Sequence, residues 1–388
     1  MSNALPAEPQ GGIARLAWVD QLRTLVIVLV VNMHACVTYS HVGSWYVKEA
    51  PDPPLHIKVA FALWQAHLQS FFMAALFLVA GYFAHGSLGR QGPARYVAGR
   101  LVRLGLPTLL YMLVIGPLIL FGINPDHSAY ASAAGAYLRY LASGRFLGGS
   151  GPMWFAVALL AFSAVLAGWR RVRPIPSPAP AGSVPTPGSV IAWALGLAVV
   201  TFLVRTVHPL GASVLNMELG YFPQYIFAFC VGVASARGGW FQPLARSPLA
   251  RRAGWLALIL GPVALAALLV AGGVLRGKGL GAFAGGWSLA ALGLATWEQL
   301  AGFGLGLGAL AFCSAELDQP TALSRWLSDR SFGVYVVHPV VLVTLAVAMR
   351  PFAGDPFLKV SMLTAGGLAG SLILADVARR IPGIRSIL

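Results

Sequence analysis

Residues 20–40 read DQLRTLVIVLVVNMHACVTYS, an apolar stretch long enough to cross a bilayer as a single helix. The whole chain of 388 residues has the same character, since 57% of it is hydrophobic and only 10% is Asp, Glu, Lys or Arg. A typical soluble domain has about 25% charged residues. These proportions exclude a water-soluble fold and a disordered or collagen-like chain, and they indicate an integral membrane protein.

Further apolar windows follow along the chain and bring the total to ten. They are 19–39, 60–84, 101–122, 152–169, 189–207, 221–236, 254–274, 284–314, 331–348 and 358–378. A helix of about 20 residues is sufficient to cross the hydrocarbon core of a bilayer. We therefore expect an all-α polytopic helix bundle with about ten transmembrane helices.

Basic residues are unevenly distributed between the segments that join these windows. The 27 Lys and Arg outnumber the 12 Asp and Glu and give a net charge of +15. About two thirds of the basic residues fall on the side of the N-terminus, which predicts cytoplasmic termini. We therefore interpret the charge as a topology signal and expect no nucleic-acid partner. This count includes Arg205 among the basic residues of the outer side.

The chain is expected to form one transmembrane domain over residues 1–388. Residues 1–18 form a cytoplasmic tail in this prediction, without a secretory signal peptide. The Pro-rich run 173–189 is expected to be a cytoplasmic linker. The outer loop 124–151 contains AYLRYLASGRFL, whose apolar spacing predicts an interfacial amphipathic helix that could act as a lid.

Ionisable residues within the first window are the strongest functional signal. Arg23 and His34 are eleven residues apart, so they share one helix face and lie about 16 Å apart along the axis. Histidine can exchange a proton near neutral pH, and arginine can bind phosphate or carboxylate. The alternatives are that Arg23 extends to the headgroups, that His34 bonds another helix, and that Asp20 pairs with a nearby arginine.

A second polar set occurs in SDRSFGVYVVHP, residues 328–339. Ser331, Tyr335 and His338 follow helical spacing and form one polar stripe on an apolar helix. They are either inward-facing site residues or a hydrogen-bonded seam between helices. Asp329 is interpreted as a helix cap at the start of this span.

Several residues elsewhere are candidates for ligand binding. Arg95, Arg100 and Arg103 could surround a polyphosphate together with Arg23, although contact with anionic lipid is the ordinary role of such a segment. Trp154 could stack on a sugar or anchor at the membrane interface. For His67 and Glu298 a structural and a substrate-binding role are equally open. Cys36, Cys230 and Cys313 show no metal-site spacing, and we expect no metal.

The ordered segments of the chain resemble the membrane-bound acyltransferase-3 superfamily, more closely its periplasmic glucan succinyltransferase-like and polysaccharide O-acetyltransferase-like members. The resemblance is carried by DQLRTLVIVLVVNMH, SFFMAALFLVAGYF, RYVAGRLVRLGLP, GPMWFAVALL, YFPQYIFAFCVGVASARGGW and SFGVYVVHP. These segments run in family order over nearly the whole chain. Gln21, where many relatives have Gly, and Asn32 close to His34 are departures that leave the acceptor open.

This resemblance implies transfer of an acyl group, acetyl or succinyl, from cytoplasmic acyl-CoA to a carbohydrate hydroxyl outside a bacterial inner membrane. It implies that Arg23 and His34 are essential and that Arg95, Arg100 and Arg103 contact the donor phosphates. Acyl-CoA would be a cosubstrate, with no tightly bound cofactor. Besides membrane lipids and the carbohydrate, a periplasmic enzyme would be a partner for any second transfer step.

His34 would act as general base or accept the acyl group itself, and the sequence leaves both routes open. Asp20 completes the polar set of the first helix. Tyr335, Ser331 or His338 would orient the base or stabilise the oxyanion. The rival hypothesis is a proton-coupled transporter or exporter, because buried His, Arg and Glu also form proton relays. A structural scaffold is a third alternative.

Overall fold

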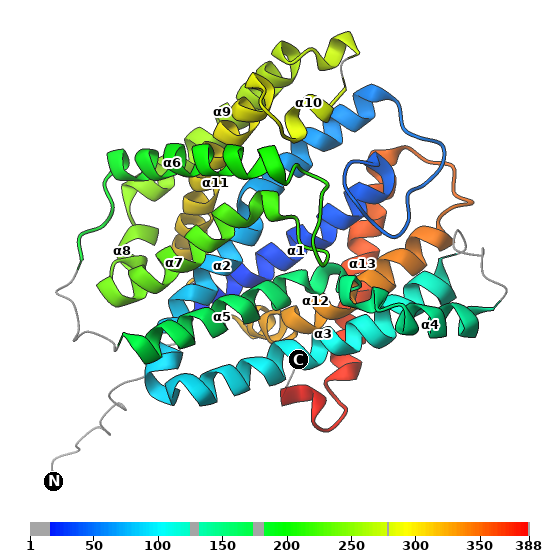
Figure 1. Ribbon diagram of the computed structural model, residues 1–388, viewed down its shortest axis with the longest axis horizontal. Coiled ribbons are helices and arrows are strands. Elements are labelled where there is room, and N and C mark those ends of the chain that lie inside the picture. Colours follow the sequence, from blue (N-terminus) through cyan, green and yellow to red (C-terminus); the bar gives the residue numbers. More distant parts are fainter. Residues whose placement is uncertain (1–15, 125–131, 174–181, 278, 387–388) are drawn as a thin grey trace.

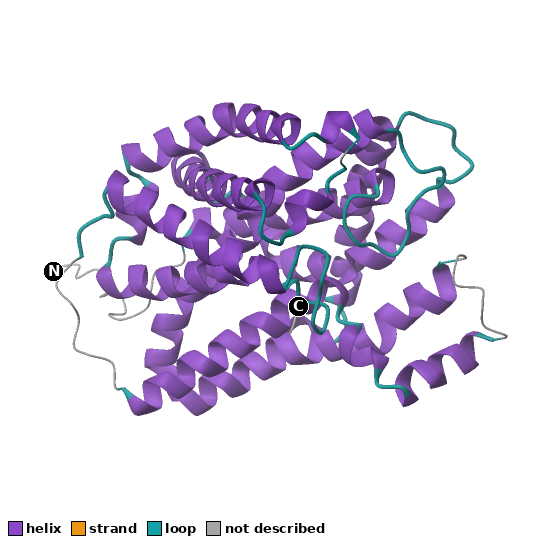
Figure 2. Cartoon of the chain, turned by 45° about the horizontal axis from the view of Figure 1, so that its top comes forward, coloured by secondary structure: helices purple, strands orange, loops and turns teal. Residues whose placement is uncertain are grey.

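The computed structural model describes residues 16–124, 132–173, 182–277 and 279–386, and these residues form helices and loops without a strand (Figures 1 and 2). The α-helices are α1 (Ala17–Ser40), α2 (Leu55–Arg100), α3 (Leu106–Leu110), α4 (Ala133–Ala142), α5 (Trp154–Val172), α6 (Pro187–Val207), α7 (Phe222–Gly238), α8 (Phe241–Ala245), α9 (Pro248–Ala271), α10 (Gly281–Ala284), α11 (Leu289–Glu316), α12 (Ala322–Ala348) and α13 (Pro356–Ala378). The predicted all-α fold is confirmed.

Eight helical segments within the described ranges are long and apolar enough to cross a membrane. Seven of them each match one predicted window. The eighth, Leu55–Ile123, contains two windows, 60–84 and 101–122, because π-helical turns and α3 continue the helix beyond α2 to Ile123. The remaining window, 284–314, falls on α11, a helix of 28 residues that is not among the eight. The side on which the termini lie stays a prediction.

A local break divides the long segment Leu55–Ile123. Gly92 has φ 75° and ψ 163°, which are not helical values, and Pro93 follows it. Proline disfavours helical geometry in the residue before it, and glycine adopts positive φ without a steric penalty. The chain therefore turns at Gly92 between the part of α2 that enters the bundle and the basic segment after it.

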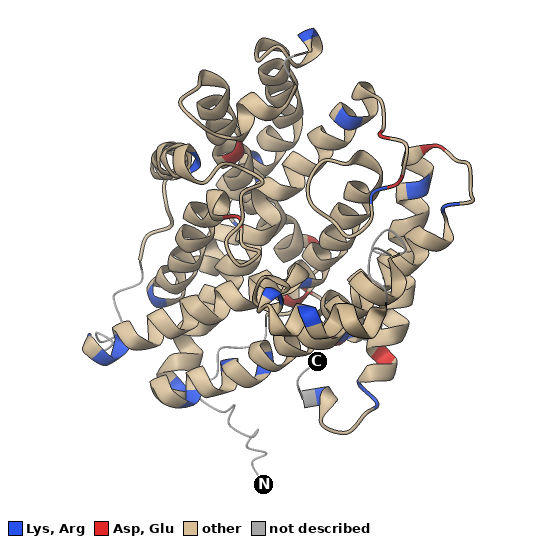
Figure 3. Cartoon of the chain, turned by 45° about the vertical axis from the view of Figure 1, so that its right-hand side comes forward, with Lys and Arg blue, Asp and Glu red and all other residues tan. Residues whose placement is uncertain are grey.

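α1 lies at the centre of the bundle, where it packs against α2, α11, α12 and α13 (Figure 1). Its apolar side chains, among them Trp18, Leu22 and Val31, are almost completely buried. Close packing of α2 on α7 depends on glycine, since a Cβ on Gly232 would stand 2.1 Å from the carbonyl oxygen of Leu78. Small residues at such crossings allow helix backbones to approach within a membrane. Figure 3 shows that charged residues are sparse and lie mostly at helix ends and in loops.

Two local predictions need correction. α12 begins at Ala322, where Thr321 and Ser324 form a capping box, so Asp329 lies inside the helix and is not its cap. A hydropathy window misses these first turns because they are polar. The linker 173–189 also ends earlier than predicted, because α6 starts at Pro187 with Thr186 as its N-cap. Residues 174–181 of that linker and 1–15 of the tail lie outside the described residues.

The helix predicted in the loop 124–151 is present as α4. Its first turn is capped by Ser132, whose side chain accepts a hydrogen bond from the N–H of Gly135. Tyr137 and Tyr140 donate hydrogen bonds to the carbonyl groups of Leu113 and Met112, so this helix is attached to the segment that follows α3. Its position at the membrane interface and its role as a lid stay predictions.

Candidate active site

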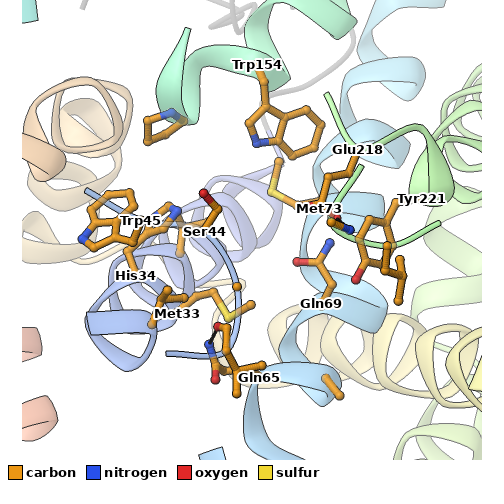
Figure 4. Close-up of a pocket in the computed structure, with 18 of the residues that line it drawn as sticks. Met33, His34, Ser44, Trp45, Gln65, Gln69, Met73, Trp154, Glu218 and Tyr221 are labelled. Atoms are coloured by element: carbon orange, nitrogen blue, oxygen red, sulfur yellow. Dashed lines mark hydrogen bonds between the residues drawn. The ribbon is translucent and has the colours of Figure 1, made fainter. Parts of the chain in front are cut away.

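A cavity of about 1020 Å³ lies beside the C-terminal half of α1. It is lined by residues of α1, α2, α7, α9, α11 and α12, by Trp154 at the start of α5, and by the loops 41–54 and 208–218. Figure 4 shows His34 and Trp45 on one side of this cavity, Glu218 and Tyr221 on the opposite side, and Gln69 and Met73 between them. The cavity is large enough for a substrate of several rings.

His34 and His338 form a hydrogen-bonded pair at this cavity. Nδ1 of His34 lies 3.1 Å from Nε2 of His338, and Nδ1 of His338 lies 2.7 Å from the carbonyl oxygen of Tyr335. Because a carbonyl oxygen only accepts, Nδ1 of His338 carries the proton, and its Nε2 accepts from Nδ1–H of His34 when both rings are neutral. This assignment leaves the lone pair of His34 on Nε2. His34 lines the cavity, whereas His338 is completely buried behind it.

Trp45 covers the imidazole of His34. Their ring centroids are 4.0 Å apart with an interplanar angle of 16°, which is a stacked arrangement. Trp45 belongs to the loop 41–54 after α1, and Tyr46 in the same loop is hydrogen-bonded to Tyr111 at 2.7 Å. Burial raises the pKa of Tyr46 to about 12, so it remains a neutral phenol. The same loop is tied to α13 by an ion pair of Glu49 and Lys359. These contacts hold the loop in place, so the stacking of Trp45 restricts the orientation of the His34 ring.

The predicted stripe on α12 is only partly assembled with His34. Tyr335 lines the cavity and donates its hydroxyl hydrogen to the carbonyl oxygen of Pro152. Ser331 instead donates to the carbonyl oxygen of Ser328 at 2.9 Å within its own helix, and it does not line the cavity. The structure therefore brings Tyr335 and His338 to His34, whereas Ser331 lies away from it.

Arg23 and Asp20 lie away from the cavity, at the N-terminal end of α1. Nη1 of Arg23 is 3.6 Å from Oδ1 of Asp20, and 45% of the Arg23 side chain is exposed. Asn32 also turns away from the cavity, because its amide donates to Thr364 of α13 and accepts from the indole of Trp64. The roles expected for Arg23 and Asp20 in the reaction stay predictions.

The three basic residues Arg95, Arg100 and Arg103 lie beyond the break at Gly92, and none of them lines the cavity. Arg95 and Arg103 are exposed, and the guanidinium of Arg100 lies 5.3 Å from the ring centroid of Tyr96. Their predicted contact with donor phosphates is untested.

Trp154 and Glu298 line the cavity, but His67 does not. Trp154 stacks on Tyr225 with centroids 5.5 Å apart. The ring centroids of His67 and Trp297 are 4.9 Å apart in an edge-to-face arrangement. Nδ1 of His67 is hydrogen-bonded to the carbonyl oxygen of Leu63 at 2.6 Å. His67 therefore packs between helices, and its predicted place in the substrate site receives no support from its position.

Glu298 is paired with a buried arginine. Nη2 of Arg205 lies 2.8 Å and 2.9 Å from the two carboxylate oxygens, and the side chains of Arg205 and Glu298 are 0% and 5% exposed. Nε of Arg205 donates to the carbonyl oxygen of Gly220, and its guanidinium lies 4.9 Å from the centroid of Tyr221. Arg205 lies in the last turn of α6, and its side stays a prediction. Charge counting could not show that Arg205 pairs with Glu298, because this partner is remote in the sequence.

The described cysteines, and the described His, Asp and Glu side chains, form no metal-binding group or disulfide. Cys36, Cys230 and Cys313 are free thiols, and no three His, Cys, Asp or Glu side chains gather in a metal-binding group within the described ranges.

Residues 16–376 match the family described as an acyltransferase domain, Acyl_transf_3. The chain belongs to the acyltransferase-3 family. The match begins just before α1 and reaches into α13, so it includes both histidines of the pair and every helix that lines the cavity. The protein is therefore a multi-pass membrane O-acyltransferase, as the resemblance predicted. Comparisons with curated proteins and with solved structures give no match.

Sequence reasoning missed several cavity residues of this acyltransferase. Trp45 and Tyr46 come from a short loop without a recognisable motif, and Glu218 and Asn216 come from another. Nothing in the sequence of these loops indicated a place at the cavity. In α2 a signal was available, because Gln65 and Gln69 are polar residues at helical spacing on one face of an apolar helix.

Proposed function

We propose that this acyltransferase moves an acetyl or succinyl group from acyl-CoA at the cytoplasmic face to a hydroxyl of an envelope carbohydrate in a bacterial plasma membrane. The observation that carries the proposal is the His34–His338 pair beside a cavity of about 1020 Å³ with aromatic, amide and carboxylate side chains. Aromatic faces and amide groups together suit a sugar, which has apolar faces and hydroxyl edges.

In the proposed reaction His34 removes the proton from the acceptor hydroxyl through Nε2. The acceptor oxygen attacks the thioester carbonyl, a C–O bond forms, and the C–S bond breaks on collapse of the tetrahedral intermediate. The coenzyme A thiolate then takes the proton from His34. His338 stabilises the transient imidazolium, because its Nε2 accepts the hydrogen bond from Nδ1–H of His34. General base catalysis of this kind contributes about 10² to 10⁴ in rate.

The position of the cavity supports an acceptor that arrives from outside. The loop 41–54 follows the C-terminal end of α1, so it lies on the outer side when the N-terminus is cytoplasmic, as the charge distribution predicts. In that orientation Arg23 lies toward the cytoplasm, where it could contact donor phosphates with Arg95, Arg100 and Arg103. The acyl group would then cross within the bundle. A second transfer step would require a periplasmic partner enzyme.

The test is mass spectrometry of envelope glycans from cells that carry the wild-type protein, no protein, or His34→Ala at matched membrane abundance. We expect an acyl-modified glycan with the wild type, but not with His34→Ala or without the protein, and its mass identifies the acyl group. His56→Ala is the matched control, because His56 is exposed at the start of α2 and outside the cavity. Equal acylation with His34→Ala would contradict the role of His34. Absence of any protein-dependent acylated glycan would contradict the proposed function.

A further inference from the structure

The charges around the cavity are unevenly distributed, and this distribution bears on which acceptor can enter. The residues that line the cavity are all described, and among them Lys48, Glu218 and Glu298 are the only Lys, Arg, Asp or Glu. Glu218 lies on the side opposite His34 (Figure 4). An acceptor that reaches His34 from within this cavity is therefore exposed to two carboxylates and one ammonium group.

The two carboxylates differ in their pairing. Both carboxylate oxygens of Glu298 accept a hydrogen bond from Arg205, which is completely buried and does not line the cavity, so this pair is close to neutral. Glu218 forms no ion pair with a described residue, and it accepts a hydrogen bond from the backbone N–H of Gly211 at 3.4 Å. Arg205 acts on Glu218 only at longer range, without a hydrogen bond between them. Glu218 is therefore the carboxylate of the wall facing His34 that has no direct ion pair with a described residue.

The one cation of the lining cannot neutralise that wall. Lys48 is exposed in the loop 41–54, and its ammonium group donates to the carbonyl oxygen of His41 at 3.3 Å in the same loop. A carboxylate or phosphate on the acceptor would leave water without gaining a buried cationic partner. Removing a charge from water without such a partner is strongly unfavourable.

We propose that the cavity selects an uncharged carbohydrate acceptor, and that Glu218 is the residue that excludes uronate and phosphate-substituted sugars. This inference rests on the proposed function, because it assumes a carbohydrate acceptor. A neutral sugar presents only hydroxyl groups, which donate to the carboxylate of Glu218 and to the amide oxygen of Gln69, whose amide nitrogen donates to Tyr225. An acidic sugar meets a like charge, and such repulsion is a common source of specificity.

The experiment measures equilibrium binding of two probes to the purified full-length protein in detergent by calorimetry, without a donor. The probes are a neutral gluco-oligosaccharide and an oligogalacturonate of the same length. We compare the wild type with Glu218→Gln and Glu218→Arg, and with Glu316→Arg as a matched control. Glu316 is exposed at the end of α11 and does not line the cavity. Elution as a single species in size-exclusion chromatography verifies that each variant is folded.

The wild type and Glu316→Arg are expected to bind the neutral probe at least about tenfold more tightly than the acidic one. Glu218→Gln should reduce this preference, and Glu218→Arg should abolish or reverse it. Equal binding of both probes by the wild type, or no binding of either, would overturn the inference. An unchanged preference in both Glu218 variants would overturn the assignment to Glu218. Failure of the proposed function appears separately, as the absence of acylated glycan in the envelope spectra.

Discussion

The buried ion pair of Arg205 and Glu298 should be a major determinant of stability. We consider Arg205→Met, which keeps much of the side-chain volume and removes the charge. Arg205 donates two hydrogen bonds to Glu298 at 2.8 Å and 2.9 Å and one to Gly220 at 3.1 Å. After the substitution, Glu298 retains a hydrogen bond from Gln299 at 3.3 Å but no cation. Loss of one partner of a buried pair costs about 3–5 kcal/mol, and we expect a value in this range.

The assay is reversible unfolding in mixed micelles, followed by tryptophan fluorescence, and it yields the free energy of unfolding of each variant. The double variant Arg205→Met with Glu298→Leu should be more stable than Arg205→Met alone, because no buried charge is left unpaired. Arg246→Met is the matched control, since Arg246 pairs with Asp318 at 2.9 Å while 56% of its side chain is exposed. An exposed pair of this kind contributes about 0–1 kcal/mol. The reasoning is refuted if Arg205→Met costs no more than Arg246→Met.

Three further predictions follow from the packing, the histidine pair and the unpaired carboxylate. Gly232→Ala should lower the free energy of unfolding by at least about 1–3 kcal/mol, because its Cβ would stand 2.1 Å from the carbonyl oxygen of Leu78. Gly99→Ala is the control, because a Cβ there has nothing within 4 Å, and it should be neutral or stabilising in the same unfolding assay. His338→Ala should reduce the rate of acyl transfer, measured as release of free coenzyme A thiol, by about 10² or more without loss of the folded protein. An unchanged rate would exclude a supporting role of His338 for His34. Burial raises the pKa of Glu218, so lowering the pH from 7 toward 5 should neutralise this carboxyl before an ordinary glutamate. In the same calorimetry the wild-type preference for the neutral probe should therefore weaken, whereas the preference of Glu218→Gln should not change with pH.

Much of the fold could be predicted because its signals are local. Apolar windows of bilayer length located every long helix, and residues 20–40 identified His34 as a costly ionisable group within a span. The boundary errors have local causes as well. The polar first turns of α12 escaped a hydropathy window. The windows 60–84 and 101–122 fall on either side of the break at Gly92 within the segment Leu55–Ile123.

The site was only partly predictable. Helical spacing predicted one inward face for Ser331, Tyr335 and His338, and all three are buried, but Ser331 does not line the cavity. It also put Arg23 on the same face as His34, and Arg23 does not line the cavity either. A shared helix face fixes an angular direction, whereas membership of a cavity also depends on depth along the axis and on what packs there. Arg23 is eleven residues from His34 on the same helix, and it lies at the exposed end of α1.

By itself, the sequence determined that this protein is a membrane-embedded helix bundle of the acyltransferase-3 family with an ionisable histidine in its first span. Hydropathy and helical periodicity suffice for the bundle and the histidine, because they depend on neighbouring residues, whereas the family followed from the resemblance of six sequence segments. Only the tertiary structure decided that His34 pairs with His338, 304 residues away, and that Trp45 stacks on His34. It also decided that Arg205 neutralises Glu298 while Glu218 has no ion pair with a described residue. These relations depend on which helices pack together and at what depth, and the free energy of that packing arises from contacts between segments that are remote in the chain.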